Sequence, residues 1–261
     1  MDGSQVTGYL ITEQISIDGM IVPNFPLGLP TRTSLSRSGD NWDDSLSCLM
    51  GLTSHNANDG TYTFFDAVQS QLSNPLFTAS LSYRRAGSLN FGSIDAAQYS
   101  GNYQDIHYTP ITRHPWSITT SSLQIGTNNS ASSYSIALKV DTGSSLICLP
   151  QQIVEWYIGN ITGASPILNR DKPYRYSVPC EAAMPDLYFG FPKGGGVKLV
   201  GETMKLYTST GGCVSLVDWE EERLSGGNYI LGAPVFLSNL VVFWNEDPQP
   251  AVGFATSREY L

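Results

Sequence analysis

Hydrophobic and polar positions fall in short runs along most of the chain, a pattern typical of β-strands. The clearest runs are rich in β-branched and aromatic residues, and Gly, Asn, Ser and Pro bound them. These runs cover residues 9–12, 76–81, 136–140 and 240–244. We therefore expect a chain built mainly of short strands and turns.

Helical spacing of apolar residues occurs in two places. Over residues 64–72 the apolar positions repeat as on one face of a helix, and the pattern stops before Asn74-Pro75. A second pattern covers 153–158 and follows Pro150, a residue that favours a helix start. Many strands with a few short helices predict an all-β fold class.

Composition narrows the class of protein. The chain has 261 residues, 41% of them hydrophobic and 14% charged, which suits a globular protein with a sizeable core. The net charge of −9 disfavours nucleic acids and anionic membranes as partners. No run of apolar residues is long enough to span a bilayer.

Two segments bear on the organisation of the chain. Residues 107–116 contain two prolines and no clear periodicity, so we expect a boundary near Arg113 that divides the chain into lobes 1–113 and 114–261. Residues 193–198, Lys-Gly-Gly-Gly-Val-Lys, lack the Gly-Lys-Ser/Thr of a phosphate loop. A β-hairpin turn explains this glycine-rich piece better.

The cysteines and histidines form no metal-binding pattern. They are widely scattered, without a Cys-x-x-Cys pair, so we expect no metal and no cofactor. Four cysteines allow three pairings, and four buried thiols are an equally open interpretation. The residues are Cys48, Cys148, Cys180, Cys213, His55, His107 and His114.

Signals for cellular location are weak. Residues 1–4 are polar and show neither the basic nor the apolar segment of a secretory signal. Two sequons, Asn128-Asn129-Ser130 and Asn160-Ile161-Thr162, are compatible with a secreted protein.

One segment carries a chemical motif. The apolar run 136–140 leads directly into Asp141-Thr142-Gly143-Ser144-Ser145 and then returns to apolar residues. A strand of this kind delivers Asp141 to a tight turn, where Gly143 frees the backbone. An ordinary Asp-Thr-Gly turn is the alternative, because Asp and Gly favour turns by themselves.

The sequence around this motif resembles the pepsin-like aspartic endopeptidases, in particular their fungal members. The resemblance follows the order of the family along nearly the whole chain. Its segments are 2–9 (the distal half of the flap hairpin), 49–52, 87–101, 116–118, 141–143, 229–236 and 252–255.

This resemblance implies a bilobal acid-protease fold with an incomplete first lobe. In the family, one carboxylate from each lobe activates a water molecule at acidic pH, and the pair shares a proton. Here Asp141 would be the second carboxylate, Thr142 would brace its loop and Ser144 would hydrogen-bond it. Asp2, Gly3 and Ser4 would face the backbone of a polypeptide substrate.

The resemblance also implies a disulfide and a location. Cys180 and Cys213 match the family's second-lobe disulfide, which forms in an oxidising compartment. Cys48 and Cys148 match no family pair, so we expect free, buried thiols. A monomer that is secreted or vacuolar follows by the same resemblance.

Parts of the family pattern are missing. Asp-Thr-Gly occurs once, and no Asp-Ser-Gly is present. The resemblance begins inside the flap, so the family's first catalytic Asp and its flap Tyr would lie upstream of Met1. We therefore expect a truncated endopeptidase that is inactive alone. The main alternative is a non-catalytic pepsin-like protein that binds peptide or a partner. A homodimer with one Asp per chain is disfavoured, because Asp141 lies mid-chain.

Overall fold

The computed structural model describes residues 5–34, 48–53, 63–113, 115–127, 131–167, 176–219, 228–246 and 248–260. The chain divides into two compact units, Met1–Leu72 and Ser73–Leu261. Both consist mainly of strands, with few and short helices, so the predicted all-β class is confirmed. The lobe boundary near Arg113 stays a prediction.

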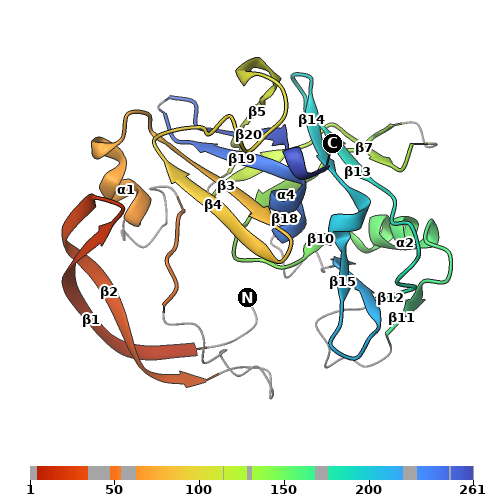
Figure 1. Cartoon of the computed structure of the whole chain (residues 1–261), viewed down its shortest axis with the longest axis horizontal. Coiled ribbons are helices and arrows are strands. Elements are labelled where there is room, and N and C mark those ends of the chain that lie inside the picture. Colours follow the sequence, from red (N-terminus) through yellow and green to blue (C-terminus); the bar gives the residue numbers. More distant parts are fainter. Residues whose placement is uncertain are drawn as a thin grey trace. The chain divides into compact units, whose positions relative to one another are not determined.

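The first unit contains a long antiparallel ribbon of two strands, β1 (Gln5–Ile17) and β2 (Met20–Ser34) (Figure 1). Its turn is Asp18-Gly19, and both residues have positive φ, which is the backbone of a tight two-residue hairpin. Helix α1 (Phe64–Val68) follows later in this unit.

Helix α1 confirms the prediction for residues 64–72. Thr63 and Asp66 form a capping box that satisfies backbone N–H groups at the helix start. The 3₁₀ turn η1 (Gln69–Gln71) continues the helix, and the Gln71 amide exchanges two hydrogen bonds with the backbone of Ile21. Phe64 packs edge-on against Phe25, with 6.2 Å between ring centres.

The prediction that Cys48 is buried is wrong. Cys48 is exposed, and residues 48–53 form no helix or strand. The neighbouring Leu49 is 82% exposed, so the segment 48–50 has no packed layer in which to bury a thiol.

The second unit contains a five-stranded antiparallel sheet of order β4-β3-β19-β20-β5. It confirms the strands expected at 76–81 and 240–244. In Figure 1, β19 lies between β3 and β20. The strands are β3 (Leu76–Ser82), β4 (Arg85–Phe91), β5 (His107–Pro110), β19 (Asn239–Trp244) and β20 (Ala251–Thr256).

Apolar side chains on both faces explain the central place of β19. Residues 239–243 are all buried, as expected of a strand covered on both sides. Phe243 stacks on Phe77 with 4.5 Å between ring centres, and Trp116 meets Phe243 edge-on at 5.0 Å. This aromatic cluster belongs to the core of the second unit.

A second five-stranded sheet carries the Asp141 motif, in the order β17-β10-β18-β9-β6. Strand β18 runs parallel to β9 and antiparallel to β10. The segment 141–146 joins β9 to β10 and therefore crosses the carboxyl end of β18. The strands are β6 (Ser117–Thr119), β9 (Ala137–Val140), β10 (Ile147–Leu149), β17 (Val217–Trp219) and β18 (Asn228–Leu231).

The remaining described strands form two four-stranded sheets, in the orders β14-β13-β7-β8 and β11-β12-β16-β15. The predicted hairpin turn at 193–198 is confirmed, because Gly194 and Gly195 link β13 to β14 with positive φ. The strands are β7 (Ser122–Ile125), β8 (Ser132–Ser133), β11 (Ser165–Pro166), β12 (Tyr176–Val178), β13 (Leu187–Gly190), β14 (Gly196–Leu199), β15 (Lys205–Tyr207) and β16 (Cys213–Ser215).

The described helices of the second unit are short. Helix α2 (Gln151–Gly159) confirms the helix predicted after Pro150, which is its N-cap. Helix α4 (Ala233–Ser238) begins with a proline in its first turn. The 3₁₀ turns are η2 (Tyr103–Asp105), η3 (Gly201–Met204) and η4 (Arg258–Tyr260). No helix among the described residues is long and apolar enough to cross a membrane.

The predicted disulfide is present. Cys180 and Cys213 are bonded across a sequence separation of 33 residues. Cys148 carries a thiol and is only half-buried, because it lies on the opposite face of β10 from the buried Ile147 and Leu149. The alternation of a strand explains why the expectation of a buried Cys148 is not met.

A buried lysine holds the chain beside this disulfide. The Lys205 side chain is 3% exposed, and its ammonium lies 3.0 Å from the Glu202 carboxylate. It also donates to the carbonyl oxygens of Cys180 (3.0 Å) and Ala182 (2.9 Å). All three ammonium hydrogens therefore have acceptors, which offsets the cost of burying the charge.

We expect Lys205→Met to lower the free energy of unfolding by about 3 kcal/mol, because it leaves the carbonyl oxygens of Cys180 and Ala182 without their hydrogen-bond donor. Denaturant unfolding monitored by circular dichroism measures this loss. The control is Lys198→Met, since Lys198 pairs with Asp186 but is 53% exposed. The control is expected to lose about 1 kcal/mol or less. Equal losses in the two variants contradict the structural role of Lys205.

Candidate active site

The Asp141 turn is anchored to its sheet by backbone hydrogen bonds. The Asp141 N–H donates to the Leu231 carbonyl at 3.0 Å and thereby extends the parallel pairing of β9 and β18 by one residue. The Ser144 N–H donates back to the Asp141 carbonyl at 3.3 Å and closes the turn. The backbone of Asp141 is therefore held at the end of a buried sheet.

The carboxylate of Asp141 has a defined setting. The Gly143 N–H donates to its Oδ1 atom at 2.9 Å, and the Lys139 ammonium lies 3.2 Å from its Oδ2 atom. The side chain is 28% exposed, so it lies at the surface of the sheet end and not in the core. One oxygen is held by the turn itself, and the other is paired with the Lys139 ammonium.

The turn is also fixed from the start of helix α4. The Gly232 N–H donates to the Leu146 carbonyl at 3.0 Å, and the Ala233 N–H donates to the Ser144 carbonyl at 2.7 Å. A Cβ atom on Gly232 would lie 2.3 Å from the Leu146 oxygen and 2.4 Å from the Ser144 oxygen. Only glycine allows this close approach of two backbones.

The predicted residues Asp141, Thr142, Gly143 and Ser144 lie together in this turn, with Thr142 exposed. The Ser144 hydroxyl donates to the Leu146 carbonyl at 3.3 Å. The Gly143 N–H is a donor to the Asp141 carboxylate. The roles assigned to Thr142 and Ser144 stay predictions. Asp2, Gly3 and Ser4, expected to contact substrate, lie outside the described residues.

Sequence reasoning missed Lys139. Side chains two residues apart on a strand point to the same face, so the alternation of β9 places Lys139 beside Asp141. That signal was present in the sequence. It becomes informative only once β9 is known to continue as far as Asp141.

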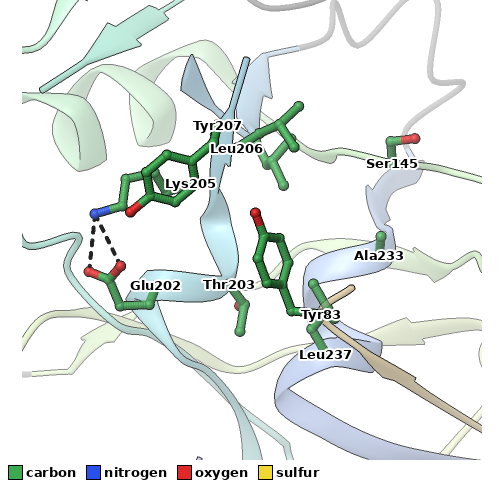
Figure 2. A pocket seen from close by; sticks show the side chains of 10 residues that line it. Tyr83, Ser145, Glu202, Thr203, Lys205, Leu206, Tyr207, Ala233 and Leu237 are labelled. Carbon is green, nitrogen blue, oxygen red and sulfur yellow. Dashed lines mark hydrogen bonds and ion pairs between the residues drawn. The ribbon is translucent and has the colours of Figure 1, made fainter. Parts of the chain in front are cut away.

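A cavity of about 400 Å³ begins next to the turn, at Ser145. Its wall is largely apolar and includes Leu206, Leu216 and Leu237. Figure 2 shows the Tyr83 ring projecting into the middle of this group, with Ser145 and Ala233 on one side and the Lys205–Glu202 ion pair on the other. The cavity has the size and lining of a site for an apolar group.

No group of three or more His, Cys, Asp or Glu residues in the described part of the chain is placed to hold a metal ion. What the turn offers chemically is a positioned, partly exposed carboxylate. Such a group accepts or donates a proton when a reactant or a second acid lies within hydrogen-bond reach.

The chain matches a protein-family model. The model described as eukaryotic aspartyl protease matches residues 1–257. The matched range includes the Asp141 turn and both glycine-containing segments that the sequence analysis singled out, 49–52 and 229–236.

Curated fungal proteins are similar to this chain. Aspartic protease pepA of Arthroderma otae is 34% identical over 74% of this chain and 50% of its own length. Endothiapepsin of Cryphonectria parasitica is 30% identical over 98% of this chain and 59% of its own length. Penicillopepsin-1 of Talaromyces stipitatus is 29% identical over 97% and 63%. The chain thus spans between half and two thirds of the length of these relatives.

Proposed function

The chain belongs to the eukaryotic aspartyl protease family, and from this premise we propose that Asp141 is one carboxylate of a two-carboxylate centre that hydrolyses peptide bonds. The proposal rests on the environment of the Asp141 side chain. Its Oδ1 atom is fixed by the Gly143 N–H while the side chain keeps 28% of its surface exposed.

The chemistry requires a second carboxyl group close to Asp141. Two carboxyl groups at short distance cannot both ionise readily, so they share a proton, as in the aspartic-protease pair. One then takes a proton from the attacking water and the other gives a proton to the peptide carbonyl oxygen. Activity at acidic pH follows from the shared proton.

This chain contributes one such carboxylate by its sequence, since Asp-Thr-Gly occurs once and Asp-Ser-Gly does not occur. We therefore propose that these 261 residues show no turnover by themselves and become active only where a second carboxyl group is supplied. The ion pair between Lys139 and Asp141 must break when the Oδ2 atom of Asp141 hydrogen-bonds the second carboxyl group. Because both side chains are partly exposed, breaking this pair costs little free energy.

The substrate we propose is an extended polypeptide. A strand-like peptide binds by backbone hydrogen bonds and places alternate side chains in pockets. Apolar residues near the cleaved bond would suit the leucine-lined cavity that begins at Ser145. We further propose a monomer without nucleic-acid partners, in keeping with the net charge of −9. The disulfide supports a secreted or vacuolar location.

The test is an assay of denatured protein as substrate at acidic pH, with and without a statin-type inhibitor. The purified chain is compared with the longest product of the same gene. We expect no cleavage by the chain alone and inhibitor-sensitive cleavage by a product that carries a second Asp-Thr/Ser-Gly. Cleavage by neither, or cleavage that resists the inhibitor, contradicts the proposal.

A non-catalytic protein that binds peptide is the second candidate, and the single Asp-Thr-Gly favours it. It predicts no cleavage by any product of the gene. It also predicts that a peptide bound by the chain is still bound after Asp141→Asn. Isothermal titration with the same denatured substrate measures this binding, and the cleavage assay distinguishes the two candidates because only the first predicts turnover.

A further inference from the structure

The sequon Asn160-Ile161-Thr162 lies where helix α2 ends. Asn160 is the C-cap residue, with φ −88° and ψ 0°, and it leads into a turn. Asn160 and Thr162 are exposed, while Ile161 between them is only 4% exposed. The buried isoleucine anchors the turn and leaves both polar side chains of the sequon on the surface.

The Asn160 side chain folds back over the last turn of the helix. Its Nδ2 atom donates to the Trp156 carbonyl at 2.8 Å. Side chains at the end of a helix cover the turn that precedes them, so the Asn160 amide lies against the backbone of Trp156. The amide nitrogen has two hydrogens, so this hydrogen bond leaves one hydrogen for substitution.

The surface of helix α2 around Trp156 is apolar. Trp156 is 39% exposed, an unusual amount for a tryptophan outside an interface. It borders a cavity of about 350 Å³ that is also lined by Leu123, Tyr134 and Ile153. A polar group that covers the ring would shield this apolar surface from water and from other chains.

We propose that Asn160 is an N-glycosylation site and that its glycan covers the exposed ring of Trp156. The sugar donor is an oligosaccharide on a lipid diphosphate. The bond between the sugar C1 atom and the diphosphate oxygen breaks, a bond from C1 to Asn160 Nδ2 forms, and Nδ2 loses one proton. The lipid diphosphate leaves, and no redox partner is needed.

This inference requires entry into the secretory pathway, and it does not require proteolytic activity. The Cys180–Cys213 disulfide points to the same oxidising compartment. The other sequon, at Asn128, lies outside the described residues. It serves as the internal comparison in the experiment.

The first experiment measures occupancy. The full chain is directed into the secretory pathway of a yeast host, and tryptic peptides are analysed by mass spectrometry before and after peptide N-glycosidase treatment. We expect a glycan on Asn160, and its loss in both Asn160→Gln and Thr162→Ala but not in Asn128→Gln. The glycan is transferred before the chain folds. Protein that misfolds and stays inside the cell therefore reports the occupancy of Asn160 as well as secreted protein does. An unmodified Asn160 overturns the proposal.

The second experiment tests contact with Trp156. Thr162→Ala removes the glycan but keeps the Asn160 amide and its hydrogen bond. We expect this change to lower the Tm of yeast-made protein, and the drop to shrink by about half or more when Trp156 is replaced by Ala, as coupled neighbours behave. The parent chain, Thr162→Ala, Trp156→Ala and the double variant are also made in bacteria, without the glycan. The Tm differences among these bacterial proteins are subtracted, because they report the effect of the substitutions alone. An equal drop in both backgrounds contradicts coverage of Trp156.

Discussion

Asp141→Asn is expected to reduce the rate of peptide hydrolysis by about 100- to 10,000-fold, the range typical for loss of a general acid or base. The amide neither takes a proton from water nor gives one to the carbonyl oxygen. Its oxygen still accepts the Gly143 N–H, so the turn keeps its shape. The lost ion pair with Lys139 is partly exposed and is worth about 1 kcal/mol or less. The measurement is the initial rate at acidic pH, on a gene product that cleaves protein.

Asp95→Asn is the matched control. Asp95 is exposed, and its Oδ1 atom accepts the Ala97 N–H at 2.8 Å, which is the same local turn geometry as in Asp141 and Gly143. This variant should retain the full rate. If Asp141→Asn has the parental Tm and cleaves as fast as the Asp95 control, Asp141 is not a catalytic carboxylate.

Gly232→Ala is expected to lower the free energy of unfolding by about 4 kcal/mol. The new Cβ atom would meet the carbonyl oxygens of Leu146 and Ser144 at 2.3 and 2.4 Å, so one backbone must move away. Overpacking of this kind costs roughly 1–3 kcal/mol. The shift also breaks the hydrogen bonds from Gly232 and Ala233, at about 1 kcal/mol each.

The control for this substitution is Gly159→Ala. Gly159 lies at the end of helix α2, and apart from the backbone of this helix no described atom lies within 4 Å of the added Cβ. Alanine in a helix is favoured over glycine by about 1 kcal/mol, so the control should be neutral or slightly stabilised. Denaturant unfolding of both variants decides the matter. If Gly232→Ala lowers the free energy of unfolding by less than about 1 kcal/mol, the backbone at Gly232 can move away from Ser144 and Leu146 at little cost, and the prediction is wrong.

The two substitutions probe different parts of one arrangement. Asp141 contributes the reactive group, while Gly232 brings the start of helix α4 against the Asp141 turn. Because of this contact, we expect Gly232→Ala to impair any activity that depends on Asp141, even where the protein remains folded. Positioned carboxylates lose rate when their support shifts by a fraction of an ångström.

Much of the local structure follows from the sequence alone. The helical spacing over 64–72 and 153–158 predicted α1 with η1, and α2, because residues close in sequence decide a helix. The run before Asp141 predicted β9, and the turn after it follows from Asp and Gly. The family resemblance added the Cys180–Cys213 pairing, which the cysteine positions alone left open.

The tertiary structure decided what surrounds Asp141 and how exposed the thiols are. Pattern reasoning did not show that the start of helix α4 contacts the Asp141 turn, nor that the Gly143 N–H donates to the Asp141 carboxylate. These contacts join segments far apart in the chain, and they depend on the order of strands in a sheet. Cys48 is exposed together with its neighbour Leu49, a fact that burial preferences of residue types do not contain. Hydrophobic periodicity identifies which residues of one helix or strand share a face. A functional site is formed by residues that are close in space but distant in sequence.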